Sequence, residues 1–439
     1  MVQMTPVPPM RCLKAHLPSS PLFSGPKVNS LSASDPQVTG LWYRVFHRFL
    51  IRFYFHRLSV LHRERIPDAG PVLYLGLHRN GAVDGFVYHA VLPGCVYLVS
   101  TQLLGNPFAR LFFTGIPVSR SKDKVRVDTS EALLRGKDLL LAGGRLFVFP
   151  EGTSTLGPRH LPFKSGAARI LADFLTSGRA ISVVPLAIAY ESPWTFRSNV
   201  EVVVGQAIST DLSGDQNADP VSVLRERITS SLEEIGVNVE SAEYLEFARK
   251  IAYAATLGTS ASYYETLKAI EDGVPERISS EWQELEAEME KNRGQPLCHQ
   301  GVPLFPVGVR VAYWLLFLVF APFALAAFAL NLPPLLGSYW AGRKFSDDLN
   351  TITLWRLLVG VPLFTIWFAA VAAATAVTGH WLAGCCYAVI SCLGLLSYYR
   401  VRKLAVAVYN SVRFPGLRKR ALAAHRIVVD ELSRAGGGQ

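Results

Sequence analysis

The sequence from residue 73 to residue 85 reads Leu73-Tyr-Leu-Gly-Leu-His78-Arg-Asn-Gly-Ala-Val-Asp84-Gly85. Its apolar part predicts a buried strand that ends at a histidine. After a polar turn, Asp84 stands at the start of an expected helix, where aspartate is a favourable cap. The spacing indicates a general base and its orienting partner, because the carboxylate of Asp84 can hold the imidazole of His78 in one tautomer. A purely structural pair is the alternative.

Short apolar runs alternate with helical stretches from residue 70 to about residue 208. The expected strands are 72–77, 96–100, 145–149, 182–189 and 200–204, and the expected helices are 85–92, 107–114, 127–142 and 166–176. This alternation predicts an α/β fold with a mixed, mainly parallel sheet flanked by helices. Ligands bind beyond the carboxyl ends of such strands, where His78 and the run Pro150-Glu151-Gly152-Thr153 are both expected.

The composition predicts a globular domain joined to membrane segments. Of 439 residues, 50% are hydrophobic and only 18% are charged, and the mean hydropathy is +0.24. The net charge of +10 suits anionic lipid or phosphorylated substrates, and the apolar segments argue against a nucleic acid as the partner. The six cysteines show no Cys-x-x-Cys spacing, so neither a zinc site nor a disulfide framework is expected.

The N-terminal segments differ from this domain, which is expected over residues 67–210. Residues 1–38 are rich in Pro, Ser and Gly, and are predicted to be a disordered tail. Residues 39–66 are predicted to form an interfacial amphipathic helix, because arginines recur every four residues among aromatic and aliphatic side chains. A surface helix packed on its own domain is the alternative.

The C-terminal part predicts a helical insert followed by transmembrane helices. Residues 211–300 are expected to be a mostly helical region that serves at most as a lid or a partner surface. Residues 301–399 are a membrane region, because the runs 357–377 and 381–399 are each long enough to span the ~30 Å hydrocarbon core. Residues 400–439 form a basic cytoplasmic tail.

The basic residues around the apolar runs predict their orientation. Lys and Arg flank the last two runs, whereas the turn at Gly379 between them has neither. The positive-inside rule therefore places both basic ends in the cytoplasm and the turn outside. If the N-terminal domain is also cytoplasmic, residues 311–340 form a re-entrant hairpin, which Pro322 and the pair Pro333-Pro334 would allow.

Four blocks of the domain carry a resemblance to a known family. They are His78 with Asp84; Ile116-Pro117-Val118-Ser119-Arg120; Phe149-Pro150-Glu151-Gly152-Thr153-Ser154 followed by Phe163-Lys164-Ser165-Gly166; and Val183-Val184-Pro185-Leu186. In this order and at these spacings they resemble the glycerolipid acyltransferase family, the membrane enzymes that acylate glycerol-3-phosphate and lysophosphatidate. The His–Asp block has five intervening residues where four are usual, which is similar to the fungal-type glycerol-3-phosphate and dihydroxyacetone-phosphate acyltransferases.

The resemblance implies a role for each of these residues. His78 would take the proton of a glycerol hydroxyl, oriented by Asp84, and a thioester substrate needs no enzyme nucleophile because it is already activated. Arg120 would bind the acceptor's phosphate as a bidentate fork, with Arg159 or Lys164 assisting. The implied substrate-binding residues are Arg120, Glu151, Gly152, Thr153, Lys164 and Pro185. No metal and no cofactor is implied, with acyl-CoA or acyl-carrier-protein as the acyl donor.

These expectations describe a membrane-bound O-acyltransferase that transfers a fatty acyl group to glycerol-3-phosphate in phospholipid synthesis. Its partners would be the acyl thioester, the glycerol-phosphate acceptor and the lipid bilayer. It would lie on the cytoplasmic face of a bacterial plasma membrane or the endoplasmic reticulum. The alternative acceptor is 1-acylglycerol-3-phosphate (lysophosphatidate), which would give phosphatidate. A non-catalytic lipid-binding membrane protein and a hydrolase are the alternatives of other classes.

Overall fold

A computed structural model describes residues 41–92, 94–105, 109–119, 128–215, 217–292, 294–308 and 310–436. The tail expected at residues 1–38 and the predicted phosphate-binding residue Arg120 lie outside the described residues.

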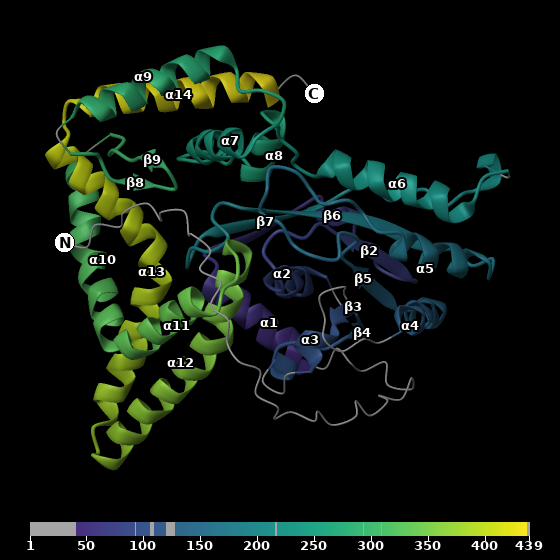
Figure 1. Ribbon diagram of the computed structural model, residues 1–439. Coiled ribbons are helices and arrows are strands. Elements are labelled where there is room, and N and C mark those ends of the chain that lie inside the picture. Colours follow the sequence, from purple (N-terminus) through teal and green to yellow (C-terminus); the bar gives the residue numbers. More distant parts are fainter. Residues whose placement is uncertain are drawn as a thin grey trace, which may run out of the picture. The chain divides into compact units, whose positions relative to one another are not determined.

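A seven-stranded sheet forms the centre of the N-terminal half of this part, in the order β1-β7-β6-β2-β5-β3-β4 (Figure 1). The strands are β1 (Arg57–Leu61), β2 (Val72–Gly76), β3 (Cys95–Ser100), β4 (Ile116–Val118), β5 (Arg145–Val148), β6 (Ser182–Tyr190) and β7 (Asn199–Val204). Every neighbouring pair is parallel except β6 and β7. The predicted α/β fold with a mixed, mainly parallel sheet is confirmed.

Different helices cover the two faces of the sheet. They are α1 (Leu41–Tyr54), α2 (Val83–Val91), α3 (Thr101–Leu104), α4 (Thr129–Leu141), α5 (Gly166–Leu175) and α6 (Pro220–Ile235). Because successive side chains of a strand point to opposite faces, Leu73 and Leu75 of β2 join the core beneath α4, α5 and α6. Val72 and Tyr74 join a second core, beneath α1 and α2. The strand that leads to His78 is therefore buried on both sides.

The helix predicted over residues 39–66 is wrong in its second half. Helix α1 ends at Tyr54, and residues 57–61 form β1, which pairs in parallel with β7 at the edge of the sheet. The arginine-rich pattern continues through both segments, so it hides the change from helix to strand. At residues 107–114, the described part contains only a 3-10 turn at Ala109–Leu111 instead of the expected helix.

The region after the sheet is helical, as expected. Its elements are α7 (Ala242–Ala255), α8 (Tyr263–Ala269), α9 (Glu276–Lys291) and a small hairpin of β8 (Cys298–His299) and β9 (Val302–Pro303). The predicted basic tail is also ordered, because α14 (Leu417–Gly436) packs against α9 and α7.

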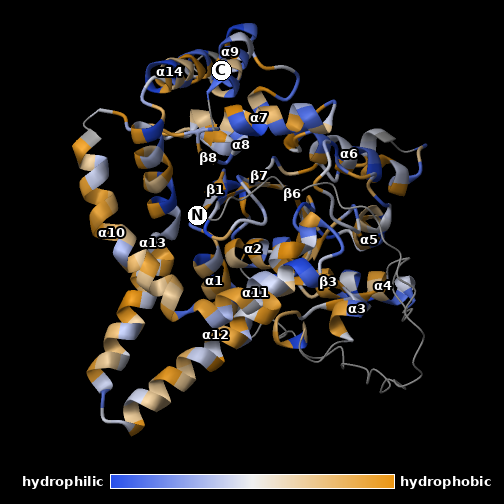
Figure 2. Cartoon of the chain, turned by 60° about the vertical axis from the view of Figure 1, so that its left-hand side comes forward, coloured by the Kyte–Doolittle hydropathy of each residue, from blue (hydrophilic) through white to orange (hydrophobic). Residues whose placement is uncertain are grey.

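Three helices of the C-terminal part are long and apolar enough to cross a membrane. These spans are Val311–Leu330, Leu349–Val377 and Trp381–Arg413. They coincide with α10 (Arg310–Leu330), α12 (Ile352–Val377) and α13 (Trp381–Arg413). The 3-10 turn η4 (Leu349–Thr351) comes directly before α12, and α11 (Leu332–Lys344) lies between α10 and this turn. Hydrophobic residues run along α10, α12 and α13 (Figure 2). Helix α10 packs along α13, and α11 returns against α12.

Candidate active site

His78 and Asp84 are in hydrogen-bond contact just beyond the carboxyl end of β2. The Nδ1 atom of His78 lies 2.9 Å from Oδ2 of Asp84. The same oxygen accepts the backbone N–H groups of Arg79 at 2.6 Å and Asn80 at 2.8 Å. An oxygen that accepts two amide hydrogens is an acceptor for the imidazole as well, so Nδ1 carries the ring proton. The free lone pair of the imidazole is then on Nε2, so Nε2 is the atom that can accept a proton.

Asp84 has a different local position from the one predicted. It lies in the first turn of α2, whose N-cap residue is Ala82, and its side chain makes no cap bond to the helix. The amides of the preceding turn take the carboxylate instead, which is why the predicted cap was wrong. Its other oxygen, Oδ1, accepts the hydroxyl hydrogen of Tyr190 on β6 at 2.6 Å. Asp84 is fully buried, and four hydrogen bonds compensate its charge.

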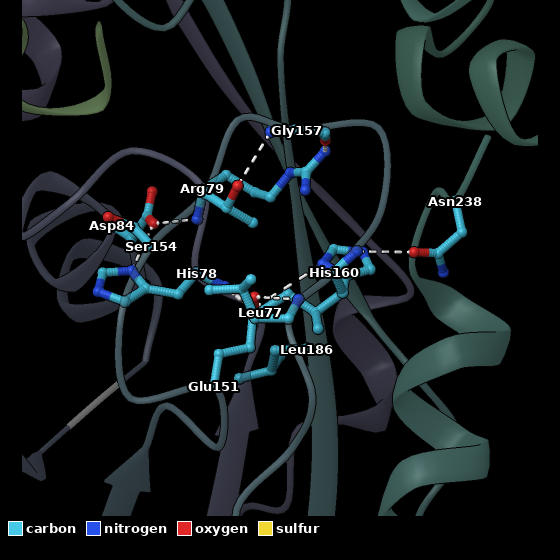
Figure 3. Close-up of polar contacts among 12 residues, drawn as sticks. Leu77, His78, Arg79, Asp84, Glu151, Ser154, Gly157, His160, Leu186 and Asn238 are labelled. Atoms are coloured by element: carbon cyan, nitrogen blue, oxygen red, sulfur yellow. Dashed lines mark hydrogen bonds and ion pairs between the residues drawn. The ribbon is translucent and has the colours of Figure 1, made fainter. Parts of the chain in front are cut away.

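The loop after β5 holds the backbone of His78. The N–H group of His78 donates to Oε1 of Glu151 at 2.8 Å, and its carbonyl accepts from the N–H group of Thr155 at 3.1 Å. The imidazole stacks on Phe149, with ring centroids 4.1 Å apart. Because β2 and β5 are neighbouring parallel strands, their carboxyl ends meet at one edge. The first and third sequence blocks therefore come together, as Figure 3 shows for His78 and Glu151.

Glu151 is a buried residue that holds backbone groups of the site in place. Its side chain is buried, and its second oxygen accepts the N–H group of Leu161 at 3.1 Å. Burial raises the pKa of the Glu151 carboxyl, and the two backbone donors partly oppose this effect. The carboxylate thus ties the end of β2 to the loop after β5. Contact of Glu151 with a substrate stays a prediction.

Gly152, Thr153 and Lys164 lie on this same loop. Gly152 has a φ of 69°, and a Cβ added there would lie 2.6 Å from Nζ of Lys164. The exposed side chain of Lys164 therefore lies directly over the loop backbone, and its own N–H group donates to Pro150. Thr153 is half-buried beside them. A cation in this place fits the assisting role that the resemblance implies for Lys164, which stays a prediction.

Pro185 and Arg159 are placed away from the position expected for them. Pro185 is buried within β6, opposite Leu75 of β2, and its ring packs against Gly205. Its buried side chain supports the sheet, and its binding role stays a prediction. Arg159 is exposed, and its Nε atom points to the carbonyl of Val239 at 3.4 Å.

Asn350 is a site residue that the sequence analysis missed. It comes from the segment between α11 and α12 and is buried. Its amide nitrogen donates to the carbonyl and the hydroxyl oxygen of Ser154, at 3.1 and 3.0 Å. Its own carbonyl oxygen lies 2.8 Å from where a Cβ on Gly81 would be, and Gly81 has a φ of 56°. The membrane region therefore contacts both the His–Asp turn and the loop after β5.

The loop after β6 anchors the same segment. The carbonyl of Pro193 accepts from the hydroxyl of Thr353 at 2.6 Å and from the side-chain amide of Asn80 at 3.1 Å. Arg356 donates to the carbonyl of Trp194. The start of α12 and the turn after His78 are therefore held by the same carbonyl group, that of Pro193. In the sequence near His78, Gly81 indicates that another part of the backbone approaches closely, but it does not identify that part.

Comparison with known proteins defines the class of this domain. Residues 57–189 match the model of the family described as Acyltransferase, so the sheet and the His78–Asp84 site belong to an acyltransferase domain. All four sequence blocks that resemble the glycerolipid acyltransferases lie within this matched range.

The similar proteins include enzymes from algae, plants and bacteria. A 1-acyl-sn-glycerol-3-phosphate acyltransferase of Chlamydomonas reinhardtii is 26% identical over 188 residues, which are 40% of this chain and 54% of that protein. The chloroplastic enzyme of the same description from Brassica napus is 25% identical over 33% of this chain and 43% of its own. The chain spans about half the length of these curated relatives. A solved 1-acyl-sn-glycerophosphate acyltransferase from Thermotoga maritima matches 45% of this chain and 81% of that chain, at 19% identity and a TM-score of 0.34.

Proposed function

We propose that the protein is a membrane-bound acyltransferase that moves a fatty acyl group from a thioester to a hydroxyl group of a phosphorylated glycerol. The observation that carries the proposal is the His78–Asp84 pair, with Nδ1 held by a buried carboxylate and Nε2 left as the basic nitrogen, in a domain of this family. The thioester would be acyl-CoA or acyl-carrier-protein.

The reaction follows from this geometry. Nε2 of His78 takes the hydroxyl proton as the acceptor oxygen attacks the thioester carbonyl. The carbon–sulfur bond of the tetrahedral intermediate then breaks, and the imidazolium returns the proton to the leaving thiolate. Asp84 stabilises the imidazolium between these steps and keeps the ring oriented, since its carboxylate is fixed by Tyr190 and two backbone amides.

Two acceptors have support. Each of the curated relatives is named as a 1-acyl-sn-glycerol-3-phosphate acyltransferase, which favours lysophosphatidate as the acceptor and phosphatidate as the product. The five residues between His78 and Asp84 favour the second candidate, glycerol-3-phosphate, because that spacing resembles the fungal-type enzymes. In either case we propose that Arg120 binds the phosphate, with Lys164 assisting.

A product assay tests the proposal and separates the acceptors. Purified full-length protein in detergent is incubated with one acyl-CoA and, in separate reactions, lysophosphatidate, glycerol-3-phosphate or dihydroxyacetone phosphate. We expect phosphatidate from the first reaction. A lyso product from the other two and none from the first would select the second candidate. Fatty acid released without any acceptor would indicate a hydrolase. Folded protein that is inactive with all three acceptors, and also when acyl-carrier-protein replaces acyl-CoA as the donor, would refute the proposal.

A further inference from the structure

A small cavity with both polar and apolar lining residues lies on the face of the sheet opposite the His78 ring. Its volume is about 40 Å³, and its lining comes from the ends of β2 and β6 and from α6, α7 and α8. Arg79 follows His78 in the chain but joins the other face, with Leu77 and Ala187 beside it. In Figure 3 the Glu151 carboxylate has the His78 backbone on one side and the His160 ring on the other. The two chain neighbours of the proposed base, Leu77 and Arg79, therefore line the cavity.

Three side chains of the lining carry buried polar atoms without a hydrogen-bond partner in the described part of the chain. These atoms are Nη1 of Arg79, the hydroxyl of Tyr263 and both ring nitrogens of His160. Arg79 is only 8% exposed and Tyr263 only 3%. A buried polar group left unpaired typically costs about 1–3 kcal/mol, so several such atoms around one cavity point to a bound group that pairs with them.

The charges around the cavity determine the sign of that group. Arg79 and Arg249 are its charged lining residues, and no carboxylate is among the lining side chains. Burial, and then the charge of Arg249, lower the pKa of Arg79 to about 10, while the charges of Glu151 and Asp84 oppose this, so Arg79 is still cationic at neutral pH. Burial also lowers the pKa of His160 to about 3, which leaves that ring neutral.

The acidic side chains nearby are already engaged. Glu151 accepts two backbone N–H groups, and Asp84 accepts four hydrogen bonds. Glu201 accepts the hydroxyl of Ser262 and the N–H group of Tyr264 at the start of α8. Two guanidinium groups, a phenol and an imidazole therefore offer donors in a place where these carboxylates, among the described residues, already accept other hydrogen bonds. An anion with several oxygens satisfies them better than water, since it also compensates the charge.

We propose that this cavity binds a phosphate group, contacted by Arg79 and Arg249 and by the hydroxyl of Tyr263. A cavity of this volume holds only a few atoms of the size of a water oxygen, which excludes an acyl chain or a nucleotide. Two sources have this chemistry: the phosphate of the acceptor, and free phosphate. The first rests on the proposed function, since Arg79 follows the proposed base in the chain, and it makes the cavity an alternative to Arg120 as the site for the acceptor's phosphate.

Binding of inorganic phosphate to the full-length protein in detergent tests the site directly, by isothermal titration calorimetry. We expect saturable binding to one site. The variant Tyr263→Phe should weaken it roughly 10-fold, as for the loss of one hydrogen bond to a charged group, and Arg249→Gln at least as much. The matched control is Arg277→Gln, which removes an exposed guanidinium that pairs with Glu431 on α14. Unsaturable binding, or equal binding by all four proteins, would overturn the proposal.

Tyr263→Phe also shows that a loss of binding is not a loss of folding. Without phosphate, this variant should have a thermal midpoint equal to or above that of the wild type, because it removes a buried hydroxyl that has no hydrogen-bond partner among the described residues. Phosphate should raise the midpoint of the wild type by more than that of the variant. An equal rise in both would count against a contact with Tyr263.

Inhibition kinetics separate the two sources of phosphate. If the cavity takes the acceptor's phosphate, inorganic phosphate competes with the acceptor and not with acyl-CoA, and Tyr263→Phe raises the acceptor's KM while sparing kcat. If phosphate binds without competing, the cavity holds free phosphate and its assignment to the acceptor is wrong. Phosphate binding by a protein that transfers no acyl group would uphold the cavity and refute the proposed function. Acyl transfer without phosphate binding would uphold the proposed function and refute the phosphate site.

Discussion

One oxygen of Asp84 decides how His78 can act. Oδ2 accepts the imidazole and two backbone amides, so the ring is held in a single tautomer by groups that are buried with it. Removing the carboxylate would also leave two buried amides unpaired, which costs stability as well as activity. Variants of His78 therefore report on catalysis more directly than variants of Asp84.

His78→Ala should lower acyl transfer by roughly 10²- to 10⁴-fold, which is the usual effect of a positioned base. The measurement is kcat at saturating thioester and acceptor, on protein whose circular dichroism and membrane association match the wild type. His62→Ala is the matched control, because that side chain is partly exposed in the turn before η1 (Arg63–Arg65). Activity of the His78 variant near that of the control would contradict the assignment.

His47 makes the stability of the protein depend on pH. It is buried between α1 and α2, with Nδ1 2.9 Å from Nδ1 of His89 and Nε2 2.7 Å from the carbonyl of Phe112. Burial, and then the charge of His89, lower the pKa of His47 to about 4, and the bond to Phe112 opposes this only in part. The unfolded chain, with a pKa of 6.5, binds the proton more readily, so stability present above pH 6.5 is lost as the pH falls toward 4.

His47→Gln should therefore reduce the loss of stability on acidification. Between pH 7.5 and pH 5 we expect the loss of unfolding free energy to shrink by roughly 1–2 kcal/mol relative to the wild type. Denaturant midpoints at the two pH values, in the same detergent, measure the difference. The same pH dependence in both proteins would show that His47 does not titrate as its surroundings require.

The segment between α11 and α12 brings the membrane region to the active site. Asn350→Ala should lower kcat roughly 10-fold without changing the KM of the thioester, because the loop that holds the His78 backbone loses its contact at Ser154. Thr353→Val is the comparison, since it removes a hydrogen bond from the same segment without touching Ser154. We expect it to lower the thermal midpoint with a smaller loss of kcat. Equal losses of kcat would mean that docking of the segment, and not Asn350, matters.

Helix α1 has a second apolar face that the domain does not cover. Leu50 and Ile51 are buried, whereas Val45 and Phe49 are 57% and 60% exposed. Phe53 of the same helix lies against Phe364 of α12, with ring centroids 5.8 Å apart, so α1 is beside a candidate membrane span. These contacts support an interfacial position for α1, with the exposed Arg48 and Arg52 at the level of the lipid headgroups.

A spin label tests this position. In a cysteine-free background reconstituted into vesicles, a nitroxide attached to Phe49→Cys should collide with oxygen more than with a water-soluble nickel complex. The control, Glu243→Cys on the exposed surface of α7, should show the opposite preference. A label at residue 49 that behaves like the control would mean that α1 lies in water.

Across the whole chain, the basic residues and the membrane helices make one orientation testable. Asn331, between α10 and α11, is fully buried and bound to Ser391 and Tyr387 of α13, which ties the first apolar segment to the last. The turn at Gly379 is then expected on the side opposite the acyltransferase domain. In a cysteine-free background, His380→Cys should react with an impermeant maleimide in intact cells, and Glu290→Cys only after lysis. The opposite pattern would reverse the predicted orientation.

The sequence by itself determined the features that depend on neighbouring residues. The apolar run before His78 forms β2, and Asp84 is only six residues from His78, so a short turn brings its carboxylate to the imidazole. Strand–helix alternation was enough for the α/β class, and length and apolar composition were enough for the candidate membrane spans. The blocks around His78 and Glu151 carried the resemblance, and they lie within the range that matches the acyltransferase model, on the neighbouring strands β2 and β5 and the loops that follow them.

Only the tertiary structure decided the contacts between residues that are distant in sequence. Strand β1 exists because β7 offers it a parallel edge, although its own sequence continues the pattern of α1. Asn350 reaches Ser154 across 196 positions of the chain, and Arg79 and Arg249 line the same cavity only because α7 covers that face of the sheet. Pro185 matched a family block and still proved to be buried. Hydrogen bonds and burial depend on which surfaces meet in space, and no local pattern carries that information.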